Sequence, residues 1–91
     1  MSKKGWSDLL HLCRGTQSNS QLDALFKLLL TLDEQEQLGT RVELLRALLK
    51  GDKTQRQIAE DLQISIAKIT RGSNALKTIP KSLRDYLSEE L

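Results

Sequence analysis

The sequence predicts an all-α protein, and three observations support this. Among the 38% of the 91 residues that are hydrophobic, 19 are leucine, against only five isoleucines and one valine. Leucine favours helices, whereas β-branched residues favour strands. The apolar positions recur at spacings of three and four residues, and the one proline, Pro80, lies near the C-terminus. We therefore expect six helices in a single domain that spans residues 1–91.

The first two helices are expected in the N-terminal third. Trp6, Leu9, Leu10 and Cys13 repeat at helical spacing, and the polar segment that follows Gly15 ends this helix. Ser20 with Asp23 three residues later predicts the cap of a second helix. This second helix is apolar on more than one face, so it must be buried from two sides. Its apolar residues are Leu22, Leu25, Phe26, Leu28, Leu29 and Leu30.

A third helix is expected from the capping box Thr31-Leu32-Asp33-Glu34 to Lys50, with Gly51 as its left-handed C-terminal residue. The acidic side chains of its first turn complement the helix dipole and need no catalytic explanation. An apolar stripe on this helix predicts the face that packs into the core. The stripe consists of Leu38, Val42, Leu45 and Leu49, flanked by Leu44 and Leu48.

Three short helices are expected after Gly51. Thr54 and Gln57 open one that runs to about Leu62, Ser65 opens the next, and the Ile79-Pro80 pair precedes a last helix. Six short helices in 91 residues bury little surface as a monomer, and several are apolar on two faces. A homodimer is therefore expected, with a small compact monomer as the alternative.

The fourth and fifth helices fit a helix-turn-helix, with the unit spanning about residues 54–78. Ile58, Leu62, Ile64 and Ile69 are expected to pack between the two helices, and the small Ala59 to permit their close crossing. The polar neighbours Ser65, Lys68, Thr70 and Arg71 then point outward. The turn carries Gln63 where glycine often supplies a left-handed conformation, and keeping that conformation with glutamine would cost about 1 kcal/mol.

The distribution of charge favours an anionic partner. Residues 62–84 carry five basic side chains and no acidic one, whereas residues 1–61 are balanced. Such a stretch over the second motif helix favours nucleic acid, and the alternative is a solvated helix surface. The five basic residues are Lys68, Arg71, Lys77, Lys81 and Arg84.

Other classes of protein are disfavoured by composition. No apolar run approaches the length of a membrane span, and no targeting segment is visible. One cysteine and one histidine make neither a disulfide nor a metal site expected. No nucleophile with a base and no carboxylate pair stands out, so an enzyme is not expected. We expect a cytoplasmic protein without membrane partners.

Two distant segments resemble the bacterial tryptophan repressor family, and the similarity extends from Trp6 to the C-terminus. They are Leu38-Gly39-Thr40-Arg41-Val42 and Ile69-Thr70-Arg71-Gly72-Ser73-Asn74-Ala75-Leu76-Lys77, with Gln55-Arg56 between them. The resemblance implies an intertwined homodimer of six-helix chains, whose N- and C-terminal helices form the dimer core. It also implies repression of tryptophan biosynthesis or transport operons when L-tryptophan is bound as corepressor, at a palindromic double-stranded operator.

The resemblance implies an L-tryptophan site at six residues. The indole ring would lie between Arg41 and Arg71, as guanidinium groups stack on aromatic faces, and Arg71 would bind the carboxylate. Thr31 of the partner chain would help to bind that carboxylate, and the carbonyl groups of Leu28 and Leu30, also of the partner chain, would meet the ammonium. Gly72 would leave room for the ring edge. Ala75 replaces a serine that contacts the ammonium in many relatives.

The resemblance also implies the DNA contacts, to which the outward-pointing Ser65 is added. The expected residues are Arg56, Ser65, Ile66, Ala67, Lys68, Thr70, Asn74 and Lys77. Lys68 departs from an uncharged family residue, and Ala59 lacks a basic side chain that many relatives carry. Operator preference is therefore expected to differ from that of the best-known members.

Two other functions stay open at this point. One is a helix-turn-helix regulator of the same kind whose effector is another aromatic or indole compound, because stacking arginines accept any flat ring. The other is a helical protein-interaction module, whose leucine-rich faces would bind another protein.

Overall fold

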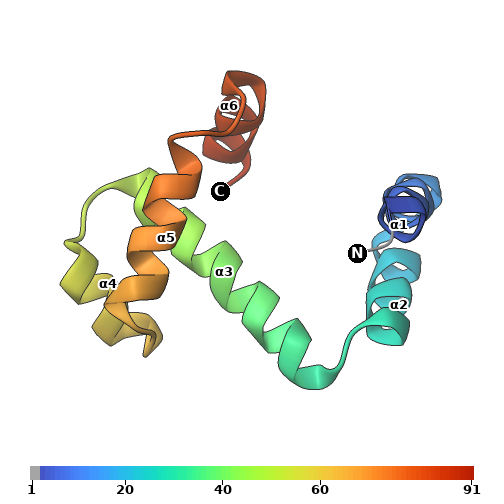
Figure 1. Cartoon of the computed structure of the whole chain (residues 1–91), viewed down its shortest axis with the longest axis horizontal. Coiled ribbons are helices and arrows are strands. Elements are labelled where there is room, and N and C mark those ends of the chain that lie inside the picture. The colour runs from blue at the N-terminus through green and yellow to red at the C-terminus, as the bar shows by residue number, and fades with distance from the viewer. Residues whose placement is uncertain (1–2) are drawn as a thin grey trace. The chain divides into compact units, whose positions relative to one another are not determined.

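The computed structural model describes residues 3–91 and is drawn in Figure 1. Within them the chain forms six helices and no strand, which confirms the expected fold class. The helices are α1 (Lys3–Gly15), α2 (Asn19–Leu29), α3 (Leu32–Lys50), α4 (Gln55–Leu62), α5 (Ile66–Leu76) and α6 (Lys81–Glu90). The chain divides into two units, residues 1–36 and 37–91, which are described separately below.

The first unit contains α1, α2 and the start of α3. The cap of α2 is Ser18, whose hydroxyl oxygen accepts the Gln21 N–H at 3.1 Å, so the prediction of Ser20 was wrong. The Gln21 side chain in turn accepts the Gln17 N–H at 2.7 Å. These two hydrogen bonds place the cap at Ser18, two residues before Ser20, and α2 begins at Asn19.

The predicted capping box at the start of α3 is confirmed. Thr31 Oγ1 accepts the Glu34 N–H at 3.1 Å, and Glu34 Oε1 accepts the Thr31 N–H at 2.9 Å. These hydrogen bonds from Thr31 hold the pKa of the exposed Glu34 carboxyl below its usual value of 4.5, because they favour the charged form. The box therefore keeps its full strength above that value and weakens as the carboxylate is protonated.

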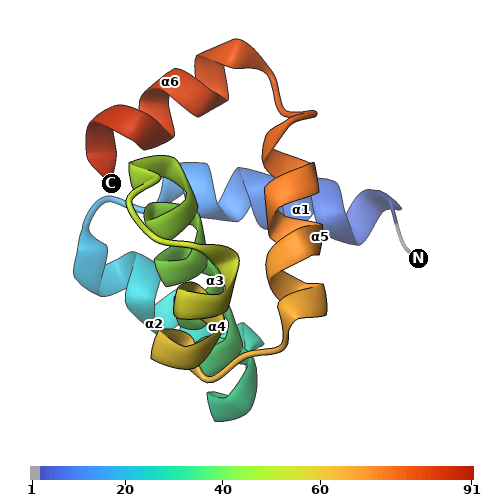
Figure 2. The same cartoon turned by 90° about the vertical axis from the view of Figure 1, so that its left-hand side faces the viewer.

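In the second unit, α4 and α5 pack beside the C-terminal half of α3 (Figures 1 and 2). The centre of this core is formed by Leu44, Ile58 and Ile69, and Ile69 is completely inaccessible to solvent. Around it lie Ala47, Leu48, Ala59, Leu62 and Ile64. The predicted packing residues of α4 and α5 are thus confirmed.

The contribution of α3 to this core differs from the predicted stripe. Leu44 is the buried residue of the helix, whereas Leu38 and Val42 are exposed and Leu45 and Leu49 are half-buried. A helix that is apolar on several sides does not reveal which side faces its own chain. Leu44 and Leu48, which were predicted only to flank the stripe, are therefore the leucines of α3 that belong to this core.

The turn between α4 and α5 keeps the left-handed conformation although it carries Gln63 in place of a glycine. Gln63 has φ 55° and ψ 45°, and its N–H donates to the carbonyl oxygen of Ala59. The N–H of Ile64 donates to the same oxygen at 3.2 Å. Ser65 then caps α5, with its hydroxyl oxygen accepting the Lys68 N–H at 3.2 Å. Hydrogen bonds thus define both ends of the turn.

Replacing Gln63 by glycine should raise the free energy of unfolding by about 0.5–1 kcal/mol, because glycine adopts a left-handed conformation without a Cβ clash. Denaturant unfolding followed by circular dichroism measures the change. The control is Gln63→Ala, which keeps the Cβ and should change stability little. A glycine variant less stable than the wild type would show that the Gln63 side chain stabilises the turn.

Candidate DNA-binding surface and ligand residues

The eight expected DNA-contacting residues all lie on the exposed surface of α4 and α5 or at the cap of α5. Ile69 and Leu76 anchor the opposite side of α5 in the core, so this helix presents a defined outer face. Ala67, Thr70 and Asn74 lie near the middle of that face by helical spacing, and Lys68 and Lys77 lie on its flanks. Among the eight residues, small side chains therefore lie near the middle of this face and the two lysines lie at its sides.

Three basic residues of this surface are free to meet an anion. Within residues 3–91, no ion pair joins Arg56, Lys68 or Lys77 to an acidic side chain, and all three are exposed. An exposed cation without a protein partner is available to a phosphate or a base edge at little cost.

The last two basic residues of the acid-free stretch are engaged within the chain. Lys81 pairs with Asp85 at 2.7 Å, one turn further along α6. Arg84 Nη1 donates to the carbonyl oxygen of Leu76 at 3.1 Å. The last carbonyls of a helix have no partner within it, so Arg84 satisfies the end of α5 from α6. Sequence reasoning missed this role, which depends on how the chain turns at Pro80.

Three of the expected ligand residues, Arg41, Arg71 and Gly72, belong to residues 37–91. Gly72 faces α3: a Cβ built on it would lie 3.0 Å from Leu44 Cδ2 and 3.6 Å from Leu48 Cδ1. Glycine at this position therefore permits α5 to approach α3 closely. Arg71 precedes this contact on α5, and Arg41 lies one turn before Leu44 on α3. Both arginines are exposed, and within residues 3–91 neither forms an ion pair.

The other three, Leu28, Leu30 and Thr31, belong to residues 1–36 and lie at the C-terminal end of α2. Leu28 lies in its last turn, where helix carbonyls lack an amide partner. The Leu30 carbonyl accepts one bond, from Gln35 Nε2 at 3.3 Å, and keeps a second lone pair. The Thr31 hydroxyl uses its oxygen as an acceptor in the capping box, so its proton stays available to a carboxylate.

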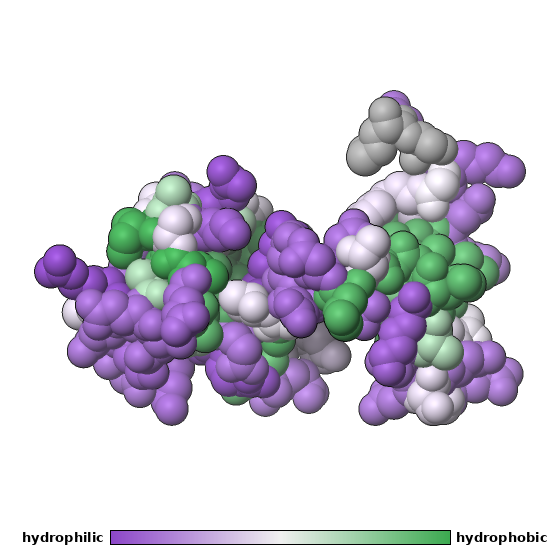
Figure 3. All heavy atoms as spheres, turned by 90° about the horizontal axis from the view of Figure 1, so that it is seen from below, coloured by the Kyte–Doolittle hydropathy of each residue, from purple (hydrophilic) through white to green (hydrophobic). Residues whose placement is uncertain are grey.

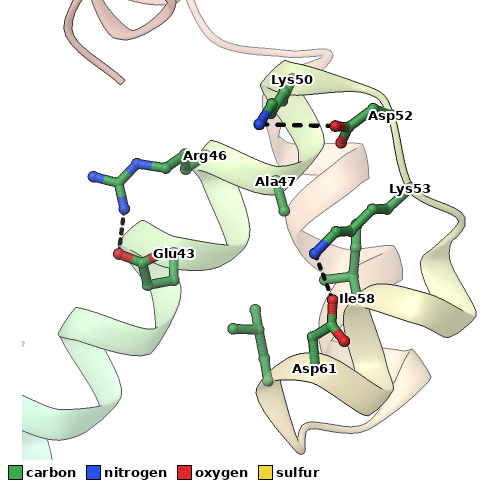
Figure 4. A pocket seen from close by; sticks show the side chains of 9 residues that line it. Glu43, Arg46, Ala47, Lys50, Asp52, Lys53, Ile58 and Asp61 are labelled. Carbon is green, nitrogen blue, oxygen red and sulfur yellow. Dashed lines mark hydrogen bonds and ion pairs between the residues drawn. The ribbon is translucent and has the colours of Figure 1, made fainter.

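A hollow of about 170 Å³ lies between α3 and α4, and none of the six candidate ligand residues lines it (Figure 4). Ala47, Ile58 and Leu62 form its apolar part. Its charged residues are paired: Arg46 with Glu43, Lys50 with Asp52 at 3.8 Å, and Lys53 with Asp61 at 2.6 Å. The hydrogen bond to Asp61 raises the pKa of Lys53, so this pair persists to alkaline pH and is lost as Lys53 deprotonates. The hollow thus offers no unpaired charge to a ligand.

Residues 3–91 contain neither a group of side chains that could hold a metal ion nor a helix that could span a membrane. No three histidine, cysteine, aspartate or glutamate side chains lie close enough together to hold a metal ion. No helix combines the length and the apolar character needed to cross a bilayer.

The fold and this surface define a class: a small all-helical protein whose two short helices, joined by a three-residue turn, present an exposed basic face suited to DNA. The profile of a family described as "Trp repressor protein" matches residues 4–91. Similar proteins include the Trp operon repressor homolog of Chlamydia trachomatis serovar D, 43% identical over 89 residues, which are 98% of this chain and 95% of that protein.

Two further similar proteins come from vibrios. The Trp operon repressor homolog of Vibrio campbellii is 44% identical over 84 residues, 92% of this chain and 84% of that protein. The Trp operon repressor homolog of Vibrio vulnificus is 46% identical over 72 residues, which are 79% of this chain and 71% of that protein. The chain belongs to the Trp repressor family, as its sequence motifs predict. It is a DNA-binding transcriptional regulator and not an enzyme.

Proposed function

We propose that the chain is a tryptophan-activated repressor, acting in the cytoplasm as a homodimer on palindromic operators of tryptophan biosynthesis or transport genes. The observation that carries the proposal is the placement of Arg71. It lies on α5 among the exposed DNA-contacting candidates and next to Gly72, where α5 meets α3. A ligand bound by Arg71 therefore acts directly on the helix that reads DNA.

The chemistry of the candidate ligand residues suits L-tryptophan. Arg41 and Arg71 are exposed and lie close in sequence to Leu44 and Gly72, where α3 and α5 meet, and guanidinium groups stack on an indole ring. Arg71 also supplies a charge for the carboxylate. The hydroxyl proton of Thr31 suits the carboxylate. The carbonyl lone pairs of Leu28 and Leu30 suit the ammonium. We propose that the partner chain contributes these three groups.

The exposed apolar surface supports a homodimer. Trp6 is 56% exposed and Leu28 is 81% exposed, and Leu38 and Val42 of α3 are exposed as well. Figure 3 shows apolar surface in green over the N-terminal helices. Large exposed apolar areas of this kind mark interaction sites, and a second copy of the chain would cover the residues that the family resemblance places in the dimer core.

Isothermal calorimetry of the purified chain tests the corepressor. We expect L-tryptophan to bind, and indole-3-propionate, indole and other aromatic amino acids serve as competitors. Tighter binding of one of these than of L-tryptophan would favour the second candidate, a regulator with another indole effector. That candidate draws support from Ala75, which lacks a hydroxyl that could accept from the ammonium. Absence of binding to all of them would contradict both.

A further inference from the structure

Lys68 has a distinctive place on the DNA-contacting surface. It is the third residue of α5, in the first turn after the Ser65 cap. Its neighbour Ile69 is completely buried, which fixes the rotation of the helix and keeps the Lys68 side chain in solvent. Within residues 3–91 no acidic side chain pairs with it. Its ammonium group is therefore unengaged, and its side chain leaves the helix at a position that the burial of Ile69 fixes.

In the first turn of α5, Lys68 is also the one side chain that is long enough to reach a base edge and can donate a hydrogen bond to it. Ile66 and Ala67 have no polar side-chain atoms, and the short Ser65 hydroxyl is held beside the backbone by the hydrogen bond of the cap. In a helix-turn-helix, the N-terminal residues of the second helix contact the base edges. The short Ala67 side chain permits the helix to lie close to the floor of the groove.

We infer that Lys68 reads a guanine in the major groove of each operator half-site; this inference rests on the DNA-binding function proposed above. A lysine ammonium has three donors and no acceptor. In the major groove guanine presents two acceptors, N7 and O6, whereas adenine presents one acceptor beside a donor, and cytosine presents a donor. Guanine is thus the base whose edge best matches an ammonium group.

Selection of bound sequences from a pool of randomised duplexes, with saturating L-tryptophan, tests the inference. The wild type should enrich a guanine at one symmetric position in each half-site, and Lys68→Ala should lose that preference. Lys68→Gln should shift it to adenine, because glutamine pairs with adenine N6 and N7. Lys77→Ala is the matched control, since it removes a cation from the same helix and should retain the guanine while weakening all duplexes alike.

A duplex in which 7-deazaguanine replaces that guanine gives a direct readout of the contact. Loss of N7 should weaken wild-type binding about tenfold and leave the affinity of Lys68→Ala unchanged. The inference would be overturned if Lys68→Ala kept the guanine preference or weakened binding to all duplexes equally. Either result would show that Lys68 does not contact the base. A wild type that binds no duplex selectively would instead contradict the proposed function itself.

Discussion

Replacing Arg71 by leucine is expected to make operator binding indifferent to tryptophan. The substitution removes the proposed partner of the ligand carboxylate and one stacking face for the indole ring. Arg71 is exposed, so the fold should be retained. Weak, non-selective DNA binding should survive, because Arg56, Lys68 and Lys77 are still present. The measurement is operator affinity of wild type and variant, each with and without saturating tryptophan.

The control for this experiment is Lys77→Leu, which removes a basic side chain from the end of the same helix. This variant should bind DNA more weakly and still respond to tryptophan. Linkage adds a reciprocal test: operator DNA must tighten tryptophan binding to the wild type by the factor by which tryptophan tightens operator binding. An Arg71→Leu protein that responds fully would contradict the placement of the corepressor at α5.

Replacing Ile69 by aspartate should unfold the unit formed by residues 37–91. Ile69 is 0% exposed and packs in the core with Leu44 and Ile58. An unpaired carboxylate at such a site costs several kcal/mol, compared with a total stability of about 5–15 kcal/mol for a small protein. Loss of helical circular dichroism and of cooperative thermal unfolding would record the change.

Ile66 provides a matched control for this substitution, because it is the same residue type one turn earlier on the same helix and is 48% exposed. Ile66→Asp should retain the fold, since a carboxylate in the first turn also complements the helix dipole. A stable, helical Ile69→Asp protein would mean that the core is centred elsewhere.

Helix boundaries are the part of the fold that the sequence predicts best, because their signals are local. Thr31 with Glu34 and Thr54 with Gln57 form the reciprocal bonds that the capping-box pattern requires. Gly51 adopts positive φ at the end of α3, as predicted, and Gln63 does so at the end of α4 in place of a glycine. The exception, Ser18 in place of Ser20, arises where two serines within three residues can both serve as a cap, so local pattern alone cannot decide between them.

The candidate site is predicted less completely, because its geometry depends on contacts between distant segments. The sequence places the outward face of α5 correctly, since the buried Ile69 and Leu76 fix the opposite side. It does not reveal that Gly72 packs against Leu44, because that contact joins residues 28 positions apart. Nor does it reveal the partner of Arg84, which lies on a different helix.

The engagement of Lys81 and Arg84 has a consequence for how binding depends on ionic strength. Each phosphate neutralised releases counterions and contributes about 0.9 to the slope of log affinity against log salt concentration. The acid-free stretch contains five cations, but two are held by Asp85 and by the Leu76 carbonyl. Because Arg71 is assigned to the ligand carboxylate, Lys68 and Lys77 remain for phosphates, and the slope contributed by this stretch should be at most about 1.8 per chain rather than about 4.5. Asp85→Asn, which releases Lys81, should steepen it, whereas Asp23→Asn, which releases Lys27 of α2, should not.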